Sequence, residues 1–317
     1  MRPEYQITAA VALDLVMGDP HWLPHPVKFI GRLGAWLERR VRSSMENEIA
    51  AGTVVGLLTI SLVLCAAAFL IWVCGFLDPI IGDLASIAII YFSIAIKDLA
   101  KHSKAVYDVL HQGDLELARS KTAMMVGRRT SELGEDELIR AAVESVAENT
   151  VDGIVAPLFY TMVFGPLGAI GYRAINTLDS MFGYKDSHYM KFGRFSARLD
   201  DLANFLPARI GALMVVPAAI IQGYRWKRAW KTLWRDRARH DSPNAGWPEA
   251  AFAGALGIRL GGRNVYGDNV ITKPYLGDML EDLKTEHIVK ANKLMICTSL
   301  LFLATGVVLR ITFTAAC

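Results

Sequence analysis

Three acidic side chains, Glu144, Glu148 and Asp152, follow Arg140 at steps of four residues. Residues four apart lie on one face of an α-helix, so this spacing predicts an acidic helix face. Three carboxylates on one face repel one another unless a cation joins them. Mg²⁺ binds carboxylate oxygens and keeps positions for phosphate and water. The segment therefore predicts a magnesium site at the three acids, with a solvated face and an Arg140–Glu144 ion pair as the alternative.

A second polar cluster mixes acids and bases beside an apolar stretch. Its members are Asn176, Asp179, Lys185, Arg194, Arg198, Asp200 and Asp201. Arginine binds phosphate oxygens through two parallel N–H groups, and a nearby aspartate can hold a metal or accept a proton. The mixture is typical of a site that handles phosphoryl groups. A salt-bridged surface helix is the alternative interpretation.

The segment 14–26 predicts a rigid turn, because three prolines and one glycine fall within nine of its residues. Such a turn fixes the directions of Asp14, Asp19 and His25, which we expect to contact a substrate or to form hydrogen bonds. A zinc site is disfavoured, because a proline precedes His25 and no third soft ligand is evident.

The segment 242–249 contains Asn244 and is followed by glycines at 254, 257, 261 and 262. Dense glycine allows a backbone to approach a ligand closely, so the stretch 254–267 is expected to close over a substrate, with a flexible loop as the alternative. The sequence has neither a Walker A motif nor a Gly-x-Gly-x-x-Gly motif after a strand, which argues against a standard nucleotide-binding fold.

The elements that carry these residues are unusually apolar. The chain has 317 residues, 53% of them hydrophobic and 21% charged, and its mean hydropathy is +0.30. This composition is too apolar for an ordinary soluble protein. The four cysteines lack the spacing of a metal site or a disulfide framework, so we expect neither.

The apolar residues form blocks, and several approach the roughly 18 to 20 residues that cross a bilayer. The blocks are 5–17, 49–77, 79–96, 151–172, 202–223 and 294–313, and the polar loops between them are 18–48, 97–150, 173–201 and 224–293. We therefore predict an all-α, polytopic integral membrane protein with a single membrane-embedded domain, 1–317. Gly165-Pro166 interrupts one block, which indicates a re-entrant segment. The first block carries Asp14 and is expected to be retained instead of cleaved.

The charge pattern suggests an orientation. Loops 18–48, 97–150 and 224–293 are rich in lysine and arginine, which favours the cytoplasmic side. Loop 173–201 is also basic, and it reaches the same side only if its flanking blocks are re-entrant. The stretch 225–239, with tryptophans at 226, 230 and 234, predicts an amphipathic interfacial helix. The net charge of +3 is scattered, so we do not expect nucleic-acid binding.

Five segments in order along almost the whole chain resemble the adenosylcobinamide-phosphate synthase family, known as CbiB or CobD. They are DLVMGDPHWLPHPVKFIG from Asp14, RAAVESVAENTVDGIVAP from Arg140, YRAINTLDSMFGY from Tyr172, ARLDDLANFLPAR from Ala197 and SPNAGWPE from Ser242. The family has distant membrane relatives of the AmpE type with a different activity. The tripeptide Arg239-His240-Asp241 departs from the family pattern, which puts one local contact in doubt.

The resemblance implies an ATP-dependent amide ligase. In that reaction a propionate carboxyl of adenosylcobyric acid joins the amine of aminopropanol phosphate, or of ethanolamine phosphate or the free amino alcohol, and Mg²⁺ accompanies the ATP. The corrinoid is then a substrate, and the protein is expected in the cell inner membrane with its catalytic loops in the cytoplasm. Self-association, or assembly with later enzymes of cobalamin synthesis, is a further expectation.

The same hypothesis distributes roles among the polar residues. Glu144, Glu148 and Asp152 would hold magnesium. Lys185, Arg194 and Arg198 would clamp phosphates. Asp179 or Asp201 would act as the base, with Asp200 and Glu148 as further catalytic candidates. Substrate contacts would come from Asp14, Asp19, His25, Asn176 and Asn244, with the first three near the same pocket.

Two other functional classes remain open at this stage. A transporter also buries carboxylates and arginines near broken helices, but clean spans are few and no inverted repeat is evident. A non-catalytic sensor of the AmpE type would need no dense polar clusters in four separate loops. Replacing Glu148 or Asp201 by alanine separates these classes, because only an enzyme should lose its function.

Overall fold

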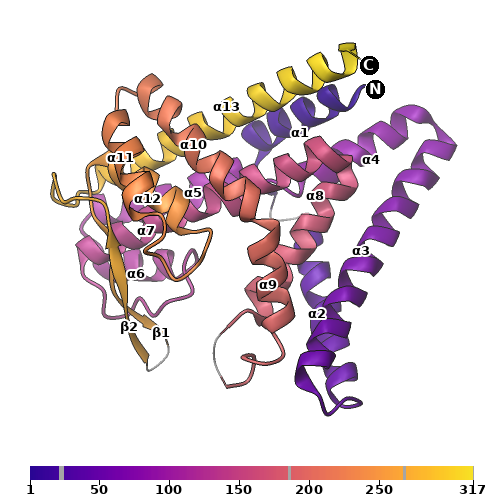
Figure 1. Cartoon of the computed structure of the whole chain (residues 1–317), viewed down its shortest axis with the longest axis horizontal. Helices are drawn as coiled ribbons and strands as arrows, with labels where there is room; N and C mark the ends of the chain where they lie inside the picture. The colour runs from indigo at the N-terminus through magenta and orange to yellow at the C-terminus, as the bar shows by residue number, and fades with distance from the viewer. Residues whose placement is uncertain (21–24, 185–186, 267–268, 317) are drawn as a thin grey trace. The chain divides into compact units, whose positions relative to one another are not determined.

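The computed structural model describes residues 1–20, 25–184, 187–266 and 269–316, and in these the chain is helical apart from one hairpin (Figure 1). The elements are α1 (Pro3–Met17), α2 (Pro26–Arg42), α3 (Glu48–Leu77), α4 (Pro79–Tyr91), α5 (Ile96–His111), α6 (Leu115–Ala123), α7 (Glu135–Thr150), the π-helix η1 (Val151–Val155), α8 (Ala156–Phe182), α9 (Arg194–Ala203), α10 (Phe205–Ile221), α11 (Trp226–Asp236), α12 (Gly246–Leu256), β1 (Leu260–Tyr266), β2 (Asn269–Leu276) and α13 (Glu286–Ala316). The predicted all-α class is confirmed, and the β1–β2 hairpin is an addition that the sequence pattern did not indicate.

Four helical stretches among the described residues are long and apolar enough to cross a membrane. They are Glu48–Leu77, Pro79–His111, Glu135–Phe182 and Glu286–Thr312, and α9 with α10 makes a fifth if the pair is one broken span. Helix α1, with 15 residues, is shorter than the roughly 18 to 20 that a span needs. A multi-pass membrane protein is therefore confirmed. The re-entrant segments stay a prediction, although Gly165, with φ 66°, does break the helical geometry within α8.

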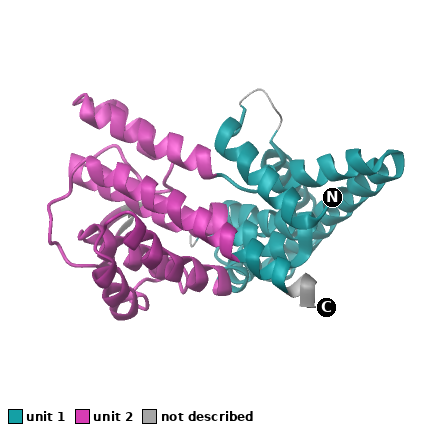
Figure 2. Ribbon diagram, turned by 90° about the horizontal axis from the view of Figure 1, so that it is seen from above, with its two compact units in different colours: residues 1–95, 156–204, 306–317 teal, residues 96–155, 205–305 magenta. Residues whose placement is uncertain are grey.

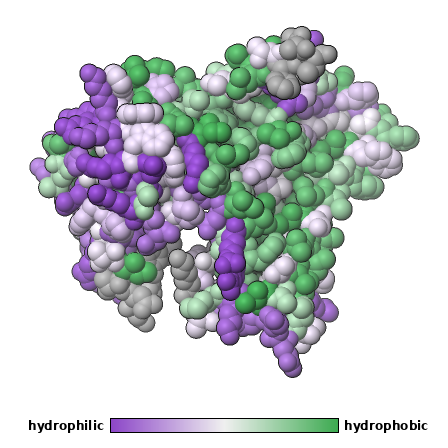
Figure 3. Space-filling view, viewed as in Figure 1, coloured by the Kyte–Doolittle hydropathy of each residue, from purple (hydrophilic) through white to green (hydrophobic). Residues whose placement is uncertain are grey.

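The hydrophobic surface lies on these stretches. Helix α3 carries a long row of exposed apolar side chains: Leu57, Leu58, Leu62, Phe69, Leu70, Trp72, Phe76 and Leu77. Figure 3 shows hydrophobic residues gathered over α3 and α8, on the right of the view. An apolar patch of this size is unfavourable in water, whereas the hydrocarbon chains of lipids can solvate it.

The chain packs into two compact units, coloured in Figure 2. Unit 1 comprises residues 1–95, 156–204 and 306–317, and unit 2 comprises 96–155 and 205–305. Each unit therefore gathers segments that are distant in the sequence. The assignment of one membrane-embedded domain stays a prediction.

The core of unit 1 forms where α2, α3 and α8 meet, and it is closed by the segment that leads into α9. Val55, Leu178, Phe182 and Phe192 are buried there together. The backbone approach is close at Gly52, where an added Cβ would lie 1.8 Å from the Phe192 carbonyl oxygen. Only glycine fits between α3 and this carbonyl.

Unit 2 is built around α12, which packs against α7, α10 and α11. Every residue of α12 except Trp247 is buried, and all but Glu249 are apolar or small. A helix that is apolar all round is stable only when it is enclosed. Beside it, β1 and β2 pair antiparallel, with Gly262 opposite Lys273 and a bulge between Leu260 and Gly262. Strand β1 of the hairpin packs against α7 and α12, and β2, which carries Lys273, packs against α12.

The Gly52 contact makes a testable prediction. Gly52→Ala should lower the thermal unfolding midpoint of the detergent-solubilised protein by several degrees, because overpacking of a tight contact costs about 1–3 kcal/mol. The matched control is Gly75→Ala on the same helix, where an added Cβ meets nothing within 4 Å. That control should be neutral or slightly stabilising, since alanine favours helix by about 0.5–1 kcal/mol over glycine. Equal midpoints for the two variants would contradict the packing described for α3.

Candidate functional site

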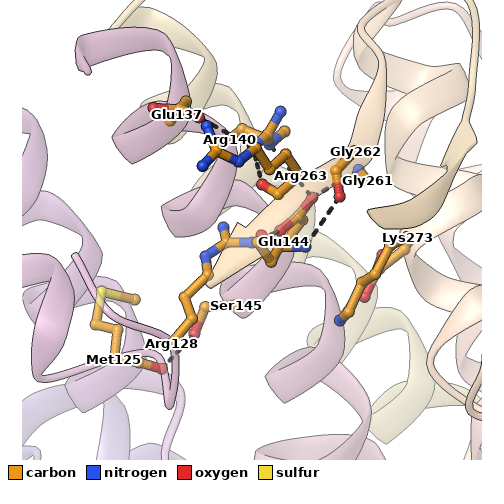
Figure 4. Close-up of polar contacts among 12 residues, drawn as sticks. Met125, Arg128, Glu137, Arg140, Glu144, Ser145, Gly261, Gly262, Arg263 and Lys273 are labelled. Atoms are coloured by element: carbon orange, nitrogen blue, oxygen red, sulfur yellow. Dashed lines mark hydrogen bonds and ion pairs between the residues drawn. The ribbon is translucent and has the colours of Figure 1, made fainter. Parts of the chain in front are cut away.

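A buried ion pair joins three separate segments of unit 2. Arg128 lies in the loop before α7, and its Nη1 is 2.9 Å from Oε2 of Glu144 on that helix, with side chains only 4% and 10% exposed. The same nitrogen donates to Oδ1 of Asn264 on β1. On the other oxygen, the Gly261 backbone N–H donates to Glu144 Oε1 over 2.7 Å. Figure 4 shows the carboxylate enclosed by Arg128, Arg140 and the hairpin.

Gly261 can occupy its place because it has no side chain. Its φ is +88°, and an added Cβ would lie 2.2 Å from the Pro274 carbonyl oxygen on the facing strand. The glycine therefore brings its N–H onto Glu144 within the hairpin. Among the predicted ligand-approaching glycines, Gly254 also serves packing, since its Cβ position is 2.6 Å from the Arg228 carbonyl oxygen on α11.

A second buried group of unit 2 centres on Glu249, the single carboxylate of α12. Its Oε1 lies 3.6 Å from Nε2 of His240, and the two side chains are only 3% and 7% exposed. The Nζ of Lys273 on β2 lies 3.5 Å from the same His240 nitrogen. An acid and a base from different elements therefore face one edge of one imidazole ring.

The pKa values of Glu249 and His240 are both shifted, mainly because the two side chains are buried. Burial raises the pKa of the Glu249 carboxyl well above its ordinary value, and the carboxylates of Glu144 and Glu148 raise it further. Burial, with the nearby charge of Lys273, lowers the pKa of His240 to about 4. His240 is therefore neutral at physiological pH. Its Nδ1 accepts the backbone N–H of Ser242 over 2.9 Å, so the ring proton is assigned to Nε2, facing Glu249.

The predicted substrate contact Asn244 lies in the turn that starts α12. The Ser242 hydroxyl oxygen accepts the backbone N–H groups of Asn244 and Ala245, each over 3.2 Å. Arg209 of α10 donates to Asn244 Oδ1 over 3.1 Å and stacks on the Trp247 ring at 4.8 Å. In this structure Asn244 therefore links α10 to the start of α12.

The acidic face of α7 is only partly as predicted. Glu148 is exposed one turn beyond the buried Glu144, as the four-residue spacing requires. Asp152 falls in the π-helix η1, so the α-helical spacing of four does not apply to it. Within the described chain no three His, Cys, Asp or Glu side chains come together as a metal site. Glu144 already has both oxygens engaged, so magnesium at this set stays a prediction without a preformed ligand cage.

The second predicted cluster forms a hydrogen-bond network in unit 1. Asp200 of α9 accepts from Asn204 Nδ2 over 2.9 Å and, more weakly, from Asn176 Nδ2 of α8 over 3.4 Å. The Tyr172 hydroxyl donates to Asn204 Oδ1 over 2.9 Å, and Arg173 donates to Asn176 Oδ1 over 3.4 Å. Asp200 is thus buried and accepts hydrogen bonds from two side-chain amides.

The remaining predictions of this cluster differ in their placement. Asp179 and Asp201, predicted as bases, lie close enough to Asp200 to interact with it electrostatically. Arg194 and Arg198 are exposed on α9, one turn apart, where they could meet a phosphate. Lys185 lies outside the described residues.

Of the predicted front turn of unit 1, the structure describes residues 14–20, 25 and 26, and the rigidity of the turn stays a prediction. Gly18 adopts φ 61° and accepts a hydrogen bond from the Tyr91 hydroxyl, while its N–H donates to the Asp14 carbonyl over 2.8 Å. His25 Nδ1 accepts the Val27 N–H over 3.2 Å and caps α2. Its Nε2 lies 3.3 Å from Asp19 Oδ2. A shared pocket with the acidic face of α7 stays a prediction for these residues.

Sequence reasoning missed five members of the unit 2 group, namely Arg128, His240, Glu249, Asn264 and Lys273. One signal was available, because Glu249 is a carboxylate in a run of small and apolar residues, where an acid is costly. Of the others, the hairpin brings in Asn264 and Lys273, the loop before α7 brings in Arg128, and the segment between α11 and α12 brings in His240. No local spacing reveals such long-range contacts.

Comparison with known proteins gives a consistent result. The family model described as CobD/Cbib protein matches residues 7–295. A protein named Cobalamin biosynthesis protein CobD from Leptospira interrogans (strain Fiocruz L1-130) is 47% identical over 295 residues, covering 93% of this chain and 94% of the relative. Proteins of the same name are 46% identical in Klebsiella pneumoniae (92% of each chain) and 44% identical in Desulfotalea psychrophila (94% and 96%). No solved structure matches the chain.

The Arg128–Glu144 pair predicts a stability effect. Glu144→Gln should lower the free energy of unfolding by about 3 kcal/mol, because it leaves a buried guanidinium without its counter-charge. The matched control is Glu137→Gln, two turns earlier on α7, where the carboxylate is 37% exposed and lies 4.0 Å from Arg140. It should cost well under 1 kcal/mol. Denaturant titration in a fixed detergent measures both. A similar small loss in the two variants would contradict a structural role for the ion pair.

The lowered pKa of His240 predicts a pH effect on stability. Between about pH 6.5 and about pH 4 the unfolded chain binds a proton at this ring and the folded chain does not. Stability should therefore fall as pH falls through this window, by up to about 3 kcal/mol from this group. His240→Gln should lose this part of the decline when unfolding midpoints are compared between pH 7 and pH 4. Parallel curves for the two proteins would show that the ring is accessible to protons in the folded state.

Proposed function

The chain belongs to the CobD/CbiB family, and on this basis we propose that it is a membrane-bound, ATP-dependent amide ligase of cobalamin assembly. The reaction joins a propionate carboxyl of adenosylcobyric acid to the amine of aminopropanol phosphate or ethanolamine phosphate. The product is adenosylcobinamide phosphate or its close analogue. ATP is the co-substrate, and Mg²⁺ enters with it.

The chemistry sets three requirements. A carboxylate is a poor electrophile, so it must first be activated, and ATP can do this by forming an acyl phosphate. Positively charged side chains must hold the phosphate groups. The amine is protonated at neutral pH and must lose a proton before it can attack.

The observation that supports the proposal is the buried group of acids and bases in unit 2. Arg128 and Lys273 can hold phosphate oxygens, and Glu249, with its raised pKa, is a stronger base than an ordinary carboxylate. A folding role alone does not explain Glu249, because among the described residues its ion-pair partner is a neutral histidine and not an arginine. Such a perturbed carboxyl beside a neutral histidine is typical of catalytic sites.

The unit 1 network is a separate set of polar groups suited to substrate contact. Arg194 and Arg198 are exposed and suited to phosphate, and Asp200 is surrounded by amides that could orient a polar substrate edge. The corrinoid is bordered by amide side chains, for which carboxylates and carboxamides are natural partners. We assign this network to substrate contact and derive no step through a bound magnesium ion.

We further propose that the catalytic loops face the cytoplasm, where ATP is available. Loops 97–150 and 224–293 contribute Arg128, His240 and Lys273 and are rich in lysine and arginine, which favours the cytoplasmic side. Helix α11 supports an interfacial position for the second loop. Its Trp226, Trp230 and Trp234 are 41–48% exposed, as interfacial anchors are.

The proposal predicts a defined activity. The full chain in lipid nanodiscs, given Mg-ATP, adenosylcobyric acid and aminopropanol phosphate, should form the condensed corrinoid detected by mass spectrometry only when every component is present. Glu148→Ala should reduce the rate at least about 100-fold, the scale of a lost acid–base or phosphate-positioning group. Glu132→Gln, a surface acid 74% exposed, is the control and should retain activity.

Either of two results would count against the ligase. Absence of product and of corrinoid binding in well-folded protein would leave the transporter or the AmpE-like sensor ahead. Product formation at the wild-type rate by Glu148→Ala would keep the function but remove the acidic face from it.

A further inference from the structure

Arg128 has more hydrogen-bonding capacity than the protein uses. Its Nη1 binds Glu144 and Asn264, whereas Nε and Nη2 are buried without a hydrogen-bond partner among the described residues. An unsatisfied buried donor is costly, and a guanidinium is rarely left in this state. Nε and a terminal nitrogen of one guanidinium form the two-pronged donor that suits phosphate oxygens. The position therefore fits an anion that is supplied from outside the chain.

A second cation and an acid lie close by on other elements. Lys273 of β2 and Glu249 of α12 both lie within 3.6 Å of the same His240 nitrogen. The charges of Arg128 and Lys273 both act on Glu249. The group therefore places two cations from different elements where both act on the Glu249 carboxyl. Solvent reaches it, since Glu148 is exposed and Lys273 is half-buried.

A ligand for such a site should carry both signs of charge. A simple anion would face Glu144, Glu148 and Glu249, and a simple amine would face Arg128 and Lys273. A small molecule with a phosphate at one end and an ammonium at the other meets both sets. Of the three substrates of the proposed reaction, only the amino alcohol phosphate has this form.

We infer that Arg128 and Lys273 bind the phosphate of the amino alcohol phosphate and that Glu249 binds its ammonium and takes the proton from it. The inference rests on the proposed function for the identity of the substrate. His240 is a positioning residue, since its neutral ring presents Nε2–H to the Glu249 carboxyl and holds it without adding a charge. The roles of Glu249 and Lys273 could not be predicted from the spacing of the acids on α7, because the two residues lie on other elements.

The chemical step balances with the groups named. As the ammonium binds, its charge favours the ionised form of Glu249, whose own proton passes to water. The ammonium then transfers one proton to the Glu249 carboxylate and becomes a neutral amine. The amine nitrogen attacks the acyl phosphate carbon, a C–N bond forms, and the C–O bond to phosphate breaks with its electron pair leaving on inorganic phosphate. The second amine proton leaves with the phosphate or passes to water.

The binding half is tested without ATP or corrinoid, by calorimetry on the full chain in nanodiscs. Three probes separate the charges: aminopropanol phosphate, aminopropanol and propyl phosphate. Lys273→Gln should weaken the binding of aminopropanol phosphate and of propyl phosphate at least tenfold and leave the binding of aminopropanol unchanged. Glu249→Gln should weaken the binding of aminopropanol phosphate and of aminopropanol. It should leave the binding of propyl phosphate unchanged or make it tighter. The controls Lys284→Gln and Glu132→Gln replace exposed residues of the same types and should bind like the wild type.

The proton-transfer half is tested with hydroxylamine, which is unprotonated at neutral pH and needs no base. With Mg-ATP and adenosylcobyric acid, Glu249→Gln should form the corrinoid hydroxamate at nearly the wild-type rate. Its rate with saturating aminopropanol phosphate should be at least about 100-fold lower, the usual scale of general base catalysis. A merely structural role for Glu249 would lower both rates together.

The outcomes separate this inference from the proposed function. Wild-type ligation with unchanged probe binding in Lys273→Gln and Glu249→Gln would overturn the inference and leave the ligase intact. Probe binding that follows the predicted charge pattern, in a wild type that never forms product, would sustain the subsite and overturn the ligase. Equal loss of hydroxamate and amide in a folded Glu249→Gln would overturn the proton-acceptor role.

Discussion

The Arg128–Glu144 ion pair is the interaction on which unit 2 depends. It ties the loop before α7 to that helix, and through Asn264 and the Gly261 N–H it ties both to the β1–β2 hairpin. The hairpin in turn determines where Lys273 lies. Because the pair is almost fully enclosed, its own attraction must offset the loss of hydration of two charges, which requires the added hydrogen bonds that the structure shows. The geometry of the site therefore depends on a contact that need not touch a substrate.

Helix α12 shows how the surroundings control one acid. Its faces are filled by alanine, glycine and leucine, so it can be enclosed by α7, α10 and α11 and can bring Glu249 into a dry environment. In water Glu249 would be an ordinary carboxylate. Among buried neighbours, with two further acids near it, the carboxyl holds its proton more strongly. The apolar composition of this helix therefore determines the chemistry of its only charged residue.

The sequence allowed the fold class and part of the site to be predicted, for physical reasons that differ. Long apolar blocks identify membrane helices because lipid imposes a minimum length, and the spacing of Glu144 and Glu148 correctly indicates one helix face. The same periodicity fails at Asp152, because a π-turn changes the rotation per residue and no local pattern marks it. It fails again for Arg128 and Lys273. Arg128 also contacts Asn264, 136 residues away on an unexpected hairpin, and Lys273 lies on the second strand of that hairpin. Local periodicity describes one helix at a time, whereas this site is assembled by four elements.

The energetics of the unit 2 group favour a chemical explanation over a structural one. Well-packed apolar residues of similar volume often stabilise a protein as well as a buried ion pair does, or better. The Arg128–Glu144 pair already joins the loop, α7 and the hairpin, so no further charged residues are needed to hold these segments together. Glu249 adds a raised carboxyl pKa, which lowers the stability of the fold at neutral pH because the unfolded chain would release that proton. A buried carboxyl that destabilises the fold in this way, within reach of the charges of Arg128 and Lys273, is best explained by a substrate that completes these interactions. A ligand bearing a phosphate and an ammonium does so for Arg128, Lys273 and Glu249 together.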